Sequence, residues 1–227
     1  MKFFDSLIIE TEKLTSPFPE KRFSKGTPWR DSGQNQIIMR RDTAFELEGV
    51  GFNLVTSSEV SDGVVIVGDD LGEIKDNRRF ARICVVQIED VGDDQKEYNL
   101  IKKIDYVKYH TFPEGYMMRS TSRSHKEAVR VSKNAIKDGA DFIKIGSLLV
   151  EKYKEIPAVK GVKVIFITDT KADYRSAERI ADKNYAIAET LNHVMNNINF
   201  DCNTCNLKAI CDEVEGMKEL HFNKADK

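Results

Sequence analysis

The alternation of apolar and polar residues along this chain predicts both strands and helices. The first segment carries an amphipathic helical pattern, which a stretch holding three of the five prolines then breaks. Two later apolar runs are typical of buried strands, and a segment of alternating apolar and charged residues indicates a third strand. We therefore predict a helix at 3–14 and strands at 37–49, 63–68 and 81–90, with polar turns between the strands.

The second half of the chain alternates strand-like and helical segments. Strand-like patterns lie at 105–112, 128–131 and 161–168, and helical patterns lie at 132–139, 142–156 and from Asp169 or Thr170 to Val194. This order predicts an α+β or α/β fold, a layered mixed sheet with helices, followed by a cysteine-rich segment that binds metal. We divide the chain into an N-terminal α+β region (1–100), a central α/β region (101–198) and a cysteine-rich segment (199–227), which could pack as one domain.

Composition narrows the class of protein. The 227 residues are 41% hydrophobic and 32% charged, and the formal net charge of −2 lacks the basic excess of a general nucleic-acid binder. No run of eighteen apolar residues is present, so we expect no membrane span. The N-terminus lacks a signal-peptide pattern, and the few, clustered cysteines favour metal binding in a reducing cytoplasm.

Three of the four cysteines lie close together near the C-terminus, at Cys202, Cys205 and Cys211. A Cys-x2-Cys pair directs two thiolates at one point, and a third thiolate a short loop later nearly completes a metal site. His221 could be the fourth ligand, or a partner chain could supply it. A [4Fe-4S] cluster and a Cys3His zinc site both accept these ligands, and the spacing alone does not separate them.

A basic stretch leads into the strand at 128–131 and includes part of it. It holds Arg119, Arg123, Lys126 and Arg130 among several serine and threonine hydroxyls. Forked guanidinium donors and hydroxyls are suited to phosphate groups, so this stretch could grip a phosphate-rich ligand, or it could be a solvated strand edge.

Other candidate chemistry is weaker. Arg40, Arg41 and Asp42 are interpreted as a surface salt-bridge group, and the isolated histidines His110 and His125 are interpreted as structural. No Ser/His/Asp constellation, phosphate-binding P-loop or dinucleotide-binding glycine motif is readable, so the catalytic residues are left unassigned.

The stretch VRVSKNAIKDGADFIKIGSLLVEKYKEIPAVKGVKVIFITD resembles the central domain of the acetyl-CoA synthase (beta) subunit of the carbon monoxide dehydrogenase/acetyl-CoA synthase family. The order of an Arg-x-Ser-Lys strand, two helices, a strand ending in Thr-Asp and a helix leading to cysteines is similar to that family. The segments IIMRRDTAFELEG and GVVIVGDDLGEI extend the resemblance more weakly.

The resemblance implies a role in anaerobic one-carbon metabolism. It implies a [4Fe-4S] cluster on Cys202, Cys205, Cys211 and His221, since His221 stands at the spacing of the family's fourth cysteine. It also implies coenzyme A binding through Arg119, Arg123 and Arg130, and carbon monoxide dehydrogenase or corrinoid protein subunits as partners. An aromatic residue expected before the Arg-x-Ser-Lys strand is Ala128 here, which disfavours adenine stacking.

The family's Cys-Gly-Cys nickel site has no counterpart in this sequence. We therefore expect an accessory or partner-binding subunit rather than a complete CO-methylating acetyl-CoA synthase. The alternatives are a non-catalytic module with a structural zinc site, and an electron-transfer partner of a corrinoid protein.

Overall fold

A computed structural model describes residues 2–121, 123–196, 205–214 and 216–225, with side chains of the last helix described as far as His221. The strands are β1 (Glu20–Ser24), β2 (Thr43–Thr56), β3 (Gly63–Val67), β4 (Arg78–Ile88), β5 (Tyr116–Ser120), β6 (Lys126–Ser132) and β7 (Val159–Ile167). The α-helices are α1 (Asp5–Thr15), α2 (Asp94–Val107), α3 (Lys133–Lys137), α4 (Phe142–Lys154), α5 (Tyr174–Met195), α6 (Lys208–Glu213) and α7 (Met217–Ala225), and a short 3-10 helix spans Arg40–Asp42.

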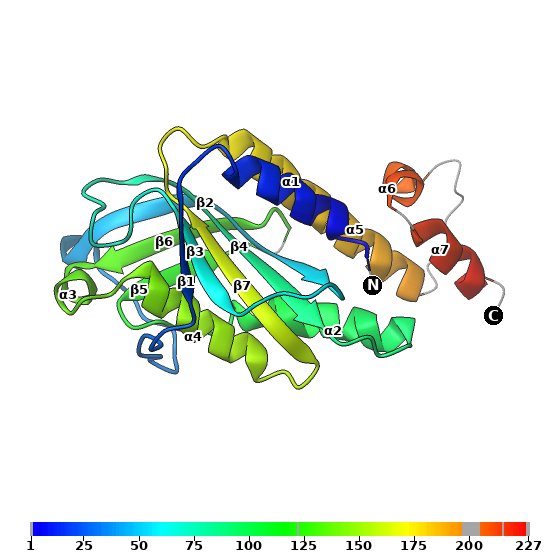
Figure 1. Ribbon diagram of the computed structural model, residues 1–227, viewed down its shortest axis with the longest axis horizontal. Coiled ribbons are helices and arrows are strands. Elements are labelled where there is room, and N and C mark those ends of the chain that lie inside the picture. Colours follow the sequence, from blue (N-terminus) through cyan, green and yellow to red (C-terminus); the bar gives the residue numbers. More distant parts are fainter. Residues whose placement is uncertain (1, 122, 197–204, 215, 226–227) are drawn as a thin grey trace.

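All seven of these strands form one open sheet in the order β1-β3-β7-β4-β2-β6-β5 (Figure 1). The pairs β2/β4 and β3/β7 are parallel, whereas β1/β3, β4/β7, β2/β6 and β5/β6 are antiparallel. The predicted mixed sheet with helices is therefore confirmed. The sheet interleaves strands from residues 1–100 with strands from residues 101–198.

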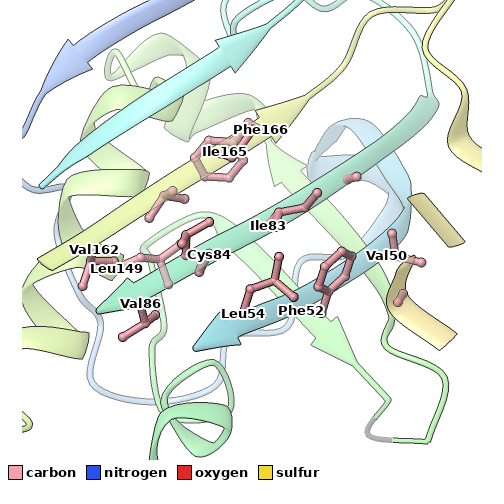
Figure 2. Packing of buried hydrophobic residues seen from close by; sticks show 14 of the residues in the cluster. Val50, Phe52, Leu54, Ile83, Cys84, Val86, Leu149, Val162, Ile165 and Phe166 are labelled. Atoms are coloured by element: carbon pink, nitrogen blue, oxygen red, sulfur yellow. The ribbon is translucent and has the colours of Figure 1, made fainter. Parts of the chain in front are cut away.

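Helices cover both faces of the sheet. The long helix α5 lies beside α1 and contacts β2 and β4, while α4 packs on β3 and β7 (Figure 1). Gly146 of α4 lies directly against Val64 and Phe166, and a Cβ at this glycine would lie 2.6 Å from a methyl group of Val64. Figure 2 shows the side chains of β2, β4 and β7 gathered into one core with Leu149 of α4 among them. Burial of this apolar surface is the main force that holds the layers together.

The strand expected at 105–112 is wrong. Residues 94–107 instead form helix α2. Its N-cap is Asp93, whose side chain accepts a hydrogen bond from the Lys96 amide at 2.8 Å. Tyr98, Ile101 and Ile104 form a buried stripe at helical spacing. The remaining predicted helices and the strands at 63–68, 81–90, 128–131 and 161–168 are confirmed with shifted ends. No helix in the described ranges has the length and apolar character needed to cross a bilayer.

Strand β2 begins later than predicted and runs further, through Thr56. Its two glycines are needed because neighbouring groups approach the β2 backbone closely, and not because the chain turns there. A Cβ at Gly49 would lie 1.7 Å from the Phe80 carbonyl oxygen, and a Cβ at Gly51 would lie 2.1 Å from the Glu127 carboxylate. Gly49 therefore allows close approach of the β4 backbone, and Gly51 leaves room for the buried Glu127 carboxylate.

Candidate functional site

The predicted phosphate-binding arginines lie near one end of the sheet but are not equivalent. Arg119 on β5 is opposite Ala128, and Arg130 on β6 is opposite Met117, so the two arginines lie on the same face two positions apart. Arg119 and Arg123 are exposed. Arg130 is half-buried and donates to Glu46 at 2.6 Å and to the Ile38 carbonyl oxygen at 3.4 Å. Arg130 is therefore largely committed to holding β6 against β2.

A groove of about 640 Å³ lies between this end of the sheet and helix α5. Its lining includes the basic residues Arg79 and Lys126 and the acidic residues Glu48, Glu178 and Asp182. Arg79 is paired with Glu178, so the groove itself has no excess of positive charge. Arg119 and Arg123 are not lining residues of the groove, but Arg119 lies opposite Ala128, which lines it.

A fully buried ion pair lies at the floor of this groove. The Arg82 guanidinium donates from Nε and from a terminal nitrogen to the two carboxylate oxygens of Glu127, at 2.8 and 2.6 Å, and Ser120 Oγ donates to Glu127 at 2.7 Å. Both charged side chains have 0% exposure. Burial lowers the pKa of Arg82, but Glu127 outweighs burial and raises the pKa well above its ordinary value. The pair is neutral as a unit and cannot serve as an external anion site.

Further hydrogen bonds continue from this pair through the interior. Arg82 also donates to the Cys84 sulfur at 3.1 Å, and burial raises the pKa of that thiol. On the neighbouring strand, the Asn53 side chain accepts from the Tyr153 hydroxyl at 2.6 Å and donates to Asp105 at 3.4 Å. These groups place polar side chains from β2, β4, α2 and α4 beside each other in an otherwise apolar core.

His125 lies beside this cluster, in the turn before β6. It is 4% exposed and is the one non-glycine residue with positive φ (46°) in the described part of the chain. Burial, reinforced by the nearby Lys108 ammonium, lowers the pKa of His125 to about 4, and Asp105 opposes this shift. His125 is therefore a neutral imidazole at physiological pH.

Sequence reasoning missed the charged residues of this cluster. Arg82 interrupts the apolar run ARICVVQI, and Glu127 precedes the apolar AVRV segment. A charged side chain within a buried strand requires a partner, and this was the available signal.

The cysteine segment packs against the end of the molecule formed by α5. Helices α6 and α7 both contact α5, and Val214, Met217 and Leu220 are buried there. Cys205 and Cys211 are half-buried, and Cys202 lies outside the described residues. Within the part of the chain that the structure describes, no group of three or more His, Cys, Asp or Glu side chains converges on a metal position.

Two of the predicted ligands, Cys211 and His221, lie on helices α6 and α7, which contact each other. A hydrogen bond from Lys218 to Asp212 raises the pKa of Lys218, and the charge of Cys211 adds to this effect. His221 follows Lys218 by three residues on the same side of α7. This arrangement places two of the predicted ligands on adjacent helices.

The sequence matches the model of one known protein family. The model of the CO dehydrogenase/acetyl-CoA synthase complex beta subunit family matches residues 33–172. The match begins before β2 and ends after β7, so it includes the buried charged pair and the arginines of β5 and β6. No curated protein matches the chain significantly. Since the match covers more than half of the sequence, the chain belongs to the CO dehydrogenase/acetyl-CoA synthase complex beta subunit family.

Proposed function

We propose that this chain is a cluster-carrying accessory subunit that binds a partner in a carbon monoxide dehydrogenase/acetyl-CoA synthase complex. The observation that carries the proposal is the position of the cysteine segment. Helices α6 and α7 pack on α5, and α5 packs across β2 and β4. Both strands lie within the residues that the family model matches. A metal centre in this segment would be held at a fixed position relative to the sheet.

The proposed ligands are Cys202, Cys205 and Cys211, with His221 as the fourth. Thiolates are the usual ligands of a [4Fe-4S] cluster, and replacement of one by histidine raises the reduction potential in known clusters. The contact between α6, which carries Cys211, and α7, which carries His221, supports a site that includes both residues. Zinc is the alternative metal, because a Cys3His set also closes a tetrahedral site.

Cysteine variants test the metal centre. Cys205→Ser, after anaerobic reconstitution with iron and sulfide, is expected to retain little iron, because one of three thiolates is lost. Cys84→Ala is the matched control: Cys84 is buried on β4 within the sheet, so its loss should leave the iron content unchanged. Equal iron contents in wild type, Cys205→Ser and Cys211→Ser would contradict the proposal.

A second proposed activity is coenzyme A binding at the rim of the 640 Å³ groove. It is supported by the exposed guanidinium groups of Arg119 and Arg123, since Arg130 is already paired with Glu46. Phosphates of coenzyme A are suited to forked, charge-assisted hydrogen bonds. The exposed Ala128 on the same face leaves this surface without an aromatic platform for adenine.

Calorimetry with coenzyme A and with dephospho-coenzyme A tests this activity. Arg119→Ala and Arg123→Ala should each weaken coenzyme A binding, whereas Lys163→Ala on β7 is a control outside the groove. Failure to detect binding at millimolar coenzyme A and low salt would remove this activity and leave the cluster proposal intact.

Partner binding requires a separate measurement. Purified carbon monoxide dehydrogenase and a corrinoid protein are each mixed anaerobically with the chain and examined by size-exclusion chromatography. Co-elution with carbon monoxide dehydrogenase is expected. Co-elution with the corrinoid protein alone would favour the electron-transfer alternative.

A further inference from the structure

A cavity of about 320 Å³ lies beside the C-terminal half of β2 and is distinct from the groove at the arginines. Strand β6 pairs with β2 only as far as Val50, so the following residues of β2 lack a strand on that side. Helices α2 and α5 flank this open edge, and Asn184 of α5 donates to the Asn53 carbonyl oxygen at 2.8 Å. The cavity occupies the space left between these two helices.

The lining is mainly apolar and aromatic. Its volume is at the lower end of the range for small-molecule sites. The apolar and aromatic contributors are Phe4, Val55, Tyr98, Ile101, Tyr106, Tyr185, Ala188 and Leu191. Such a wall favours a ligand whose body is apolar.

His125 provides an unpaired polar group in this wall. The ring centroid lies 6.1 Å from those of Phe52 and of Tyr185, and the Asn184 side chain is a polar neighbour of the ring. Among the described residues, no group is placed to complete a hydrogen bond with His125 Nε2, although this atom is buried. The backbone is held in its positive-φ conformation by the Gly51 amide, which donates to the His125 carbonyl oxygen at 2.8 Å. A buried, unpaired N–H group costs about 1–3 kcal/mol, which a ligand oxygen would recover.

The neighbouring Lys108 determines which ring nitrogen of His125 carries the proton. Lys108 Nζ lies 3.5 Å from His125 Nδ1 and 2.7 Å from the Asp105 carboxylate. An ammonium group only donates, so Nδ1 must accept and the ring proton must reside on Nε2. In this tautomer Nε2 is a hydrogen-bond donor and has no lone pair for a metal ion.

We propose that this cavity binds a small, uncharged molecule whose apolar body fills the space and whose carbonyl oxygen accepts a hydrogen bond from His125 Nε2. An anionic ligand is disfavoured because the carboxylates of Asp105 and Glu189 line the cavity. Of the nearby ammonium groups, Lys108 is already paired with Asp105, and Lys102 lies over the Tyr98 ring. A cationic ligand is disfavoured because it offers no acceptor to His125 Nε2, the unpaired buried atom among the described lining residues, and because Lys102 in the lining would repel it. The site is independent of the cysteine segment.

Acetophenone is a suitable probe, because it combines an aromatic body with one carbonyl oxygen. Ethylbenzene has a similar shape without the oxygen, and benzoate carries a negative charge. Acetophenone should bind about tenfold more tightly than either compound, since each reference compound leaves the donor unpaired or adds repulsion. In protein labelled with ¹⁵N histidine, acetophenone should also shift the Nε2 resonance of His125 while that nitrogen remains protonated.

His125→Asn tests the residue, because asparagine tolerates positive φ but its amide is too short to reach the same position. It should weaken acetophenone binding about tenfold. The matched control is His110→Asn, an exposed histidine that does not line the cavity, and its affinity should be unchanged.

Several results would overturn the proposal. These are equal affinity for ethylbenzene, tighter binding of benzoate, no acetophenone binding at millimolar concentration, or an unprotonated Nε2 in the free protein. The nitrogen resonance of the wild-type protein decides the question even if His125→Asn fails to fold.

Discussion

The buried pair between Arg82 and Glu127 gives the sharpest prediction about stability. Glu127→Gln keeps the size of the side chain but removes the charge that neutralises Arg82. Both side chains are completely buried, and the carboxylate accepts two guanidinium hydrogen bonds and one from Ser120. Leaving a buried charge without its partner costs about 3–5 kcal/mol, so the variant should lose about that much free energy of unfolding.

The cost should arise from the unpaired charge rather than from lost contacts. The double replacement Arg82→Met with Glu127→Leu removes both charges and fills a similar volume. Such replacements are often neutral or stabilising, so the double variant should be markedly more stable than Glu127→Gln alone. Ser120→Ala removes one hydrogen bond to a charged group and should cost about 1.5–3 kcal/mol.

Urea unfolding followed by far-ultraviolet circular dichroism measures these differences, with the dependence on urea compared among variants to confirm that the same surface is exposed. A loss below about 1 kcal/mol for Glu127→Gln would refute the reasoning, because it would mean that water or another group solvates Arg82. Equal stability of the single and double variants would refute it as well.

The remaining predictions concern the histidines, the arginines and the cysteines. The pKa of His125 is lowered from 6.5 to about 4, so the folded protein should lose up to about 3 kcal/mol as pH falls from about 6.5 through 4, and His125→Asn should reduce this slope in urea unfolding at several pH values. Arg119→Ala should weaken coenzyme A binding by about 1.5–3 kcal/mol in calorimetry, and no change would exclude that contact. His221→Cys should keep the cluster and lower its reduction potential in a redox titration, and an unchanged potential would mean that His221 is not a ligand.

The sequence was informative where hydrophobic periodicity was uninterrupted. Strand β7 and helix α5 were predicted because each has an unbroken buried side, over Val159–Ile167 and Tyr174–Met195. Helix α2 was missed because only three of its residues, Tyr98, Ile101 and Ile104, are buried and most of the others are charged or polar. An amphipathic stripe this narrow resembles a polar turn followed by a strand.

The candidate sites also differ in how far they could be predicted from the sequence. The Cys-x2-Cys spacing is local in sequence, so it could be read directly, whereas the Arg82–Glu127 pair joins residues 45 positions apart. The role of His125 depends on Lys108, on Gly51 and on the edge of β2 that β6 leaves open. Such contacts arise from the strand order, which the sequence pattern did not specify.

The central claim is that the cysteine segment, which packs on α5, carries an iron–sulfur cluster. The most direct test is iron and acid-labile sulfide analysis of anaerobically purified protein, together with electron paramagnetic resonance after reduction. The account predicts about four irons and four sulfides per chain and a reduced [4Fe-4S] signal that is lost in Cys205→Ser. A colourless protein that holds one zinc, or no metal at all, would contradict it.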